Sequence, residues 1–149
     1  MNKQHWYFAM RHYLLMLAGL NLLWEIAQLP LYTIWQTGST KDIIIAVLHC
    51  TAGDVFIAIS ALILALMLLG TGDWPKHRYL RVSVFAVLVG QIYTIYSERV
   101  NLSSGAWGYS DWMPIIPWLE VGLTPVVQWI VIPIYCFWKI QKPTTCKNI

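Results

Sequence analysis

Charged residues are scarce in this 149-residue chain. Asp, Glu, Lys and Arg make up 11% of it, whereas about 25% is usual for a soluble domain, and hydrophobic residues make up 58%. This composition excludes an ordinary soluble protein and predicts an integral membrane protein. The net charge is only +3 and is not gathered on one face, so nucleic acid is not an expected partner.

Cysteine is also rare, which excludes a disulfide framework. The three cysteines are Cys50, in the second apolar run, and Cys136 and Cys146, near the end of the chain. A bridge from Cys50 would have to cross the bilayer, and a bridge between the other two would form in a reducing compartment. We therefore expect all three to be free thiols.

Long apolar runs are what the chain has in abundance. Four of them, at 13–35, 43–69, 82–97 and 114–138, approach the roughly 20 residues that a helix needs to cross a bilayer. The third is short unless it continues through Glu98 to Asn101. Because 149 residues leave no room for a second domain, residues 1–149 are predicted to form one all-α domain, an integral membrane four-helix bundle.

Lysine and arginine set the predicted orientation. Eight of the ten lie in the N-terminal arm, the middle loop and the tail, and only Lys41 and Arg99 lie in the other two loops. The positive-inside rule then places both termini in the cytoplasm. The predicted location is the cell inner (plasma) membrane, as a multi-pass protein with the lipid bilayer as its surroundings.

Each predicted span contains one acidic residue: Glu25, Asp54, Glu98 and Glu120. A carboxylate at the bilayer centre costs at least about 2.5 kcal/mol, so four of them predict a polar site inside the membrane. Depth along the helices places Glu25 and Asp54 near the midplane and the other two toward the outer leaflet. A cavity at this site is expected to open outward, or sideways into the outer leaflet, and to be closed toward the cytoplasm.

Further polar residues follow these acids at helical spacing, and Gly53 is expected to allow a neighbouring backbone to approach closely. The candidate catalytic residues are Glu25, Asp54, Glu98 and His49. The candidate substrate-binding residues are Gln28, Tyr32, Tyr93, Tyr96, Asn101, Trp107, Glu120 and Gln128.

The outward loop at 102–118 is rich in aromatic residues and glycine. Two interpretations stay open. The loop folds back over the helices as a lid, or its tryptophans form an aromatic belt at the membrane surface.

Several short motifs run through the chain: Trp24-Glu25-x-x-Gln28-x-Pro30-x-Tyr32, His49-Cys50-x-x-Gly53-Asp54, Tyr93-Thr94-x-Tyr96-Ser97-Glu98-x-x-Asn101, Trp107-x-Tyr109, Met113-Pro114 and Gln128-Trp129. Together they resemble a family of small bacterial inner-membrane proteins with four spans. That family has no assigned activity, so the resemblance implies the fold and the membrane but no mechanism.

Three functions compete. The first is binding of a lipid, an isoprenoid or another small molecule, or acid/base chemistry on it, at the intramembrane carboxyl groups. The second is metal-ion binding or transport, with His49, Glu25 and Glu98 as candidate ligands, although no metal-binding spacing is present. The third is a structural role, as a homo-oligomer or as a subunit beside another membrane protein. Whether the protein is an enzyme, and which cofactor it uses, stay open.

Overall fold

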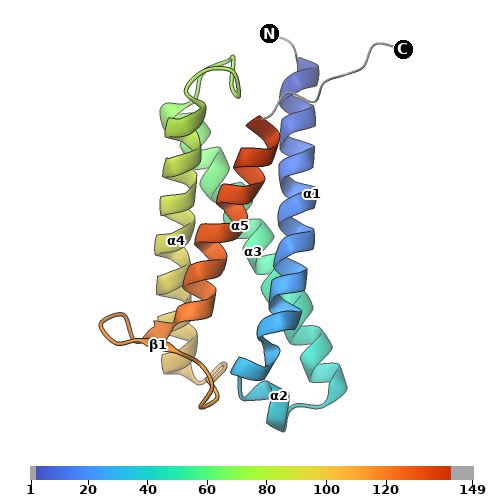
Figure 1. Ribbon diagram of the computed structural model, residues 1–149, viewed down its shortest axis with the longest axis vertical. Coiled ribbons are helices and arrows are strands. Elements are labelled where there is room, and N and C mark those ends of the chain that lie inside the picture. Colours follow the sequence, from blue (N-terminus) through green and yellow to red (C-terminus); the bar gives the residue numbers. More distant parts are fainter. Residues whose placement is uncertain (1–2, 142–149) are drawn as a thin grey trace.

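The structure is a computed structural model that describes residues 3–141, with side chains described from residue 7 onward. The chain is mostly helical, and four helices are long and apolar enough to cross a membrane, as the sequence predicts. They are α1 (Lys3–Gln28), α3 (Thr40–Leu69), α4 (Tyr79–Ser104) and α5 (Leu123–Gln141). The four lie side by side, with α1 and α4 each packed against both α3 and α5 (Figure 1).

Helix boundaries follow local chemistry. Pro30 cannot donate a backbone hydrogen bond, and α1 ends at Gln28, before the predicted residue 35. A short 3-10 helix η1 (Leu29–Leu31) and one turn, α2 (Ile34–Thr37), then lead to α3. That helix starts with a capping box, in which the Ser39 hydroxyl accepts from the Asp42 N–H and the Asp42 carboxylate accepts from the Ser39 N–H.

The third and fourth spans differ from the predicted ranges. α4 continues to Ser104 and ends at Gly105, whose φ of 72° is the left-handed conformation that favours glycine. The third span is therefore of full length and contains both Glu98 and Asn101. The fourth span starts at Leu123 instead of residue 114, because prolines interrupt the preceding segment and Glu120 adopts a left-handed φ of 55°.

A small hairpin occupies the residues where the fourth helix was expected to begin. It pairs β1 (Ile115–Ile116) with β2 (Val121–Gly122) in antiparallel register, Ile115 opposite Gly122 and Ile116 opposite Val121. The all-α prediction thus misses two short strands outside the four long helices.

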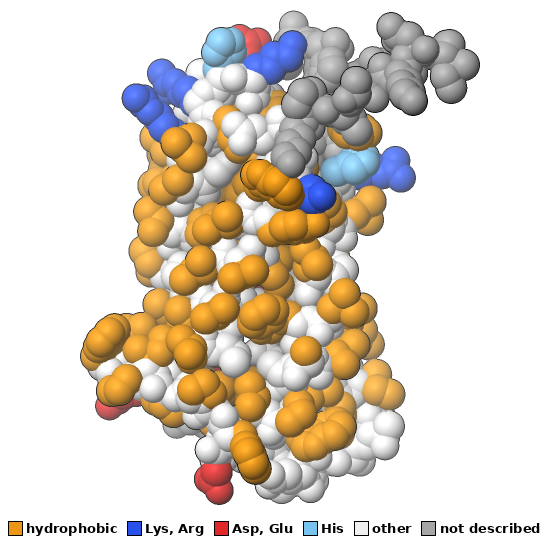
Figure 2. Space-filling view, viewed as in Figure 1, with side chains coloured by type: hydrophobic (Ala, Val, Ile, Leu, Met, Phe, Trp, Pro, Cys, Tyr) orange, Lys and Arg blue, Asp and Glu red, His pale blue; other side chains and the backbone are white. Residues whose placement is uncertain are grey.

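Apolar core and polar cavity occupy opposite halves of the molecule. At the end where α1 begins and α5 ends, Tyr13, Leu17, Leu62, Val82 and Phe137 pack together and are almost completely buried. The buried polar residues Asn21, Gln28, Thr94, Glu98 and Gln128 lie toward the other half. Outside the core, the helices present apolar side chains to their surroundings, as a membrane-spanning surface requires (Figure 2).

Candidate functional site

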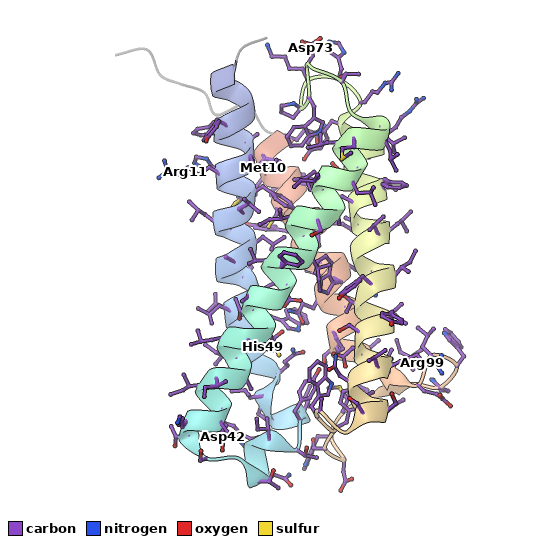
Figure 3. All side chains as sticks on the ribbon, turned by 180° about the vertical axis from the view of Figure 1, so that it is seen from behind. Met10, Arg11, Asp42, His49, Asp73 and Arg99 are labelled. Atoms are coloured by element: carbon purple, nitrogen blue, oxygen red, sulfur yellow. The ribbon has the colours of Figure 1, made fainter. Side chains whose placement is uncertain are left out.

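A cavity of about 870 Å³ opens in the half of the molecule away from the ends of the described chain. Its wall includes residues of α1, α3, α4 and α5, together with η1, α2 and the Gly105–Gly108 part of the outward loop. In Figure 3, His49 and Asp42 mark this half and Arg11 and Asp73 mark the other. The sequence predicts a cavity in this half of the molecule and leaves open whether the loop at 102–118 covers it.

Gln128 forms the centre of a buried polar network. Its side-chain nitrogen lies 2.9 Å from the Asn21 carbonyl oxygen, 3.0 Å from a Glu25 oxygen and 2.9 Å from an Asp54 oxygen. Gln128 is only 2% exposed. One amide group therefore joins α1, α3 and α5 and brings the Glu25 and Asp54 carboxyl groups together on a single nitrogen.

Further donors position the two carboxyl groups. The Gln28 side-chain nitrogen donates to the same Glu25 oxygen at 3.0 Å. The Trp24 indole N–H in turn donates to the Gln28 side-chain oxygen at 3.2 Å. On the other side, the indole N–H of Trp129 donates to the second Asp54 oxygen at 3.0 Å. Each carboxyl group is thus oriented by a partner besides Gln128.

Trp129 reaches Asp54 because α4 carries a glycine at the contact. A Cβ atom on Gly90 would lie 2.2 Å from Cζ3 of the Trp129 ring, far inside van der Waals contact. The glycine that allows close approach is therefore Gly90. The corresponding expectation for Gly53 was wrong, since no atom outside its own helix lies within 4 Å of a Cβ placed there.

Glu98 forms a second polar centre beside the outward loop. The residue is 8% exposed and accepts a hydrogen bond from the Tyr109 hydroxyl. The Tyr109 hydroxyl in turn accepts from the Gly122 N–H at 2.9 Å. A single phenol therefore connects α4 to the loop and to β2.

Backbone hydrogen bonds fasten the same loop to the segment after α1. Tyr109 forms a β-bridge with Tyr32, the Ser110 N–H donates to the Leu31 carbonyl oxygen at 2.9 Å, and the Thr33 N–H donates to the Gly108 carbonyl oxygen at 2.9 Å. The loop lies across one side of the cavity, where Trp107 and Gly108 form part of the wall. This position favours the lid over a belt alone, although Trp112 and Trp118 are exposed as a belt requires.

Burial raises the pKa of Tyr109, and its hydrogen bond to Glu98 raises it further. Burial likewise raises the pKa of Tyr32, with the Glu98 carboxyl as the next cause. Both phenols therefore keep their protons near neutral pH, and Tyr109 remains a donor to Glu98.

The carboxyl groups of the cavity keep acceptor capacity beyond their present donors. Gln128 and Gln28 donate to Glu25, and Gln128 and Trp129 donate to Asp54, whereas an ionised carboxyl group has about four acceptor sites. The described residues that line the cavity include no lysine or arginine. The site can therefore hold a proton between its carboxyl groups, or accept N–H or O–H donors from a bound molecule.

Nine of the predicted site residues line this cavity: Glu25, Gln28, Tyr32, His49, Asp54, Glu98, Asn101, Trp107 and Gln128. His49 lies on its wall with an exposed side chain.

Three predicted site residues lie elsewhere. Tyr93 and Tyr96 are 51% and 63% exposed and contact each other on the outer face of α4, because the helix turns its Thr94 and Glu98 face inward. Glu120 belongs to the loop and not to a span, and it is exposed in an ion pair with Arg99 at 3.2 Å. Three of the four long helices thus contain an acidic residue, and α5 contains none.

Sequence reasoning missed Tyr109, Trp129 and Thr94 as parts of the site. Trp129 follows Gln128 directly, and Thr94 lies one helical turn before Glu98, so both had a signal in the sequence. For Tyr109 the sequence contains no such signal other than its place in an aromatic loop. Cys50 and Cys136 are free, as expected, and Cys146 lies outside the described residues.

The alternative of a metal site lacks a set of ligands in the described part of the chain. Among residues 7–141, no group of three or more His, Cys, Asp and Glu side chains is placed to hold a metal ion. His49, Glu25 and Glu98 share the cavity wall without forming such a group.

Comparison of the chain with family models, with curated proteins and with solved structures finds no match. The function is therefore inferred from the geometry of the cavity itself.

Proposed function

We propose that this multi-pass membrane protein binds a lipid, an isoprenoid or another small molecule in the cavity and uses its carboxyl groups for recognition or acid/base chemistry. In this proposal the four helices form a bundle in the bacterial inner membrane, with both termini in the cytoplasm and the cavity open toward the outer leaflet. The resemblance to small four-span bacterial proteins is part of the same proposal.

One observation carries it: besides the exposed Asp42 in the first turn of α3, three carboxyl groups within the long helices, from Glu25, Asp54 and Glu98, line a single cavity, and no lysine or arginine is among its described lining residues. Placing a charged group in a membrane costs at least about 2.5 kcal/mol, and a polar contact between helices returns only about 0.6 kcal/mol on average. Holding helices together therefore does not account for three such groups around an open space.

The geometry suggests distinct roles. Glu25 and Asp54 lie against the same amide nitrogen, and a proton shared between them would remove one of the two negative charges. Glu98 lies beside the loop, where the Tyr109 phenol keeps a proton next to it. The first pair is placed to donate or accept a proton deep in the cavity, and Glu98 is placed to contact a molecule under the loop.

Native mass spectrometry of the purified full chain tests the proposal. We expect a small molecule or lipid to leave with the wild-type protein, and Asp54→Asn and Glu98→Gln to reduce its occupancy at least fivefold. Glu120→Gln is the matched control, since that carboxylate is exposed outside the cavity and should leave occupancy unchanged.

The network around Gln128 also supports the structural alternative, because it connects three helices. The two proposals differ in their outcome. If no bound molecule is found in wild type, and the cavity variants only lower the unfolding temperature, the carboxyl groups serve assembly and the binding proposal is wrong.

A further inference from the structure

Building on the proposed binding function, we propose that the ligand is a lipophilic amine, with a protonated primary amino group held at the carboxyl-lined wall and an apolar body in the rest of the cavity. This inference names the ligand class for the site; the cavity and its carboxyl groups are those described above.

Charge is the first reason. Glu25, Asp54 and Glu98 all line the cavity, and its described residues supply no lysine or arginine. The Arg99 guanidinium, on the same helix as Glu98, is instead paired with Glu120 at the surface. An ammonium group would supply the positive charge that the protein does not place there.

Hydrogen-bond counting narrows the choice of cation. Glu25 accepts from Gln28 and Gln128, and Asp54 accepts from Gln128 and Trp129. An ionised carboxyl group has about four acceptor sites, so both can accept further N–H donors. A primary ammonium carries three N–H donors, whereas a quaternary ammonium carries none. The site is therefore complementary to an amine with N–H groups.

An unpaired hydroxyl on the wall points to a bound molecule. Thr94 is 7% exposed, and its hydroxyl has no hydrogen-bond partner among the described residues. It lies on the cavity wall, one helical turn before Glu98. Buried polar groups are normally paired, so this hydroxyl leaves room for a ligand atom near Glu98.

The remainder of the wall suits an apolar body. Leu29, Ile34, Ile45, Val47 and Ile57 line it, and a volume of about 870 Å³ is in the range of drug-sized ligand sites. Trp107 and Trp129 line the same space, and aromatic rings beside a cation attract it through their π-systems. Charge and shape together describe a molecule with one amino group on a hydrocarbon skeleton.

Three probes of equal chain length test this inference: decylamine, decyltrimethylammonium and 1-decanol. Each is titrated into the purified full chain, and one-to-one adducts are counted by native mass spectrometry. We expect decylamine to bind at least tenfold more tightly than either of the others. Asp54→Asn and Glu98→Gln should each weaken decylamine binding at least tenfold, whereas Glu120→Gln should not change it.

Glu98→Gln is included because Glu98 lies outside the network that joins α1, α3 and α5, so this variant keeps the test valid if Asp54→Asn does not fold. If 1-decanol binds as tightly as decylamine, the amine inference is wrong while the binding proposal stands. If decyltrimethylammonium binds as tightly as decylamine, the cation does not need N–H donors, and the choice of a primary amine is wrong. If no probe binds and no molecule leaves with the wild-type protein, both proposals fail.

Discussion

Gln128 joins three of the four long helices through one amide group. It is buried on α5, and its partners belong to α1 and α3, more than 70 positions away in the sequence. Because its nitrogen is shared among three oxygens, the position of this side chain sets the positions of both Glu25 and Asp54. Removing the amide leaves these oxygens without their common donor.

We predict that Gln128→Leu destabilises the protein by about 1 to 3 kcal/mol, the usual cost of leaving buried polar groups unpaired. The measurement is the free energy of unfolding in detergent, followed by circular dichroism. Gln141→Leu is the matched control, since it makes the same change at an exposed position near the end of the same helix. Equal stability of the two variants would contradict the network as described.

Tyr109 gives a second prediction at the residue scale. Tyr109→Phe removes the donor to Glu98 and the acceptor for the Gly122 N–H, so it should loosen the loop against α4. The expected loss of stability is about 1 to 3 kcal/mol, since one of the two bonds involves a carboxyl group. Hydrogen exchange should also rise at 109–122 in the variant and remain unchanged in α3.

The same phenol makes stability depend on pH. Burial raises the pKa of Tyr109 above its unfolded value of about 10, so the folded state binds this proton more tightly. The contribution of the protonated Tyr109 phenol to the free energy of unfolding is present in full below about pH 10. It is lost as the pH rises toward and through the raised pKa of the folded state. Unfolding temperatures measured from pH 8 to 11 should fall more steeply for wild type than for Tyr109→Phe; parallel curves would contradict this.

Helix α4 and helix α5 meet where Gly90 faces the Trp129 ring. Gly90→Ala should push this ring away and break its bond to Asp54, with a loss of about 1 to 3 kcal/mol from overpacking. Gly19→Ala is the control, since a Cβ atom there meets nothing within 4 Å and alanine is favoured over glycine in a helix by up to about 1 kcal/mol. The unfolding temperature should therefore fall for Gly90→Ala and hold or rise for Gly19→Ala.

The sequence predicts the four long helices because the length and apolarity of a run are properties of the run itself. Boundaries were less predictable. The segment before Leu123 is as apolar as a helix, but its prolines and the left-handed Glu120 make it a loop with a hairpin, which removed Glu120 from the site. Composition alone does not distinguish an apolar loop from a helix.

Partners within the site were the hardest to predict. Helical spacing placed Glu25 and Gln28 on one face of the first helix, and they do share a network. The rotation of each helix depends on packing that no single segment encodes, so Tyr93 and Tyr96 were placed in the site although they face outward. The bond between Tyr109 and Glu98 depends on how the loop folds back, which residue spacing does not specify.

At the scale of the whole molecule, charge is distributed unevenly along the long axis. Lys and Arg side chains gather at the end where α1 begins, where Asp73 also lies, whereas the face drawn at the opposite end shows acidic side chains and no Lys or Arg (Figures 2 and 3). Arg11, Lys76, Arg78, Arg81 and Lys139 belong to the described part of the basic end, whereas Lys142 and Lys147 lie outside the described residues. This arrangement supports a cytoplasmic basic end under the positive-inside rule.

Single-cysteine labelling tests this orientation. In a background with Cys50, Cys136 and Cys146 changed to alanine, Asp111→Cys should react with a membrane-impermeant maleimide in intact bacterial cells, because its loop faces outward in the proposed topology. Asp73→Cys, at the opposite end and also exposed, should react only after the cells are opened. A permeant maleimide that labels both variants equally is the control for expression and exposure. If Asp73→Cys is labelled in intact cells and Asp111→Cys is protected, the protein is inverted, the cavity opens toward the cytoplasm, and its ligand must be sought in the inner leaflet or the cytosol.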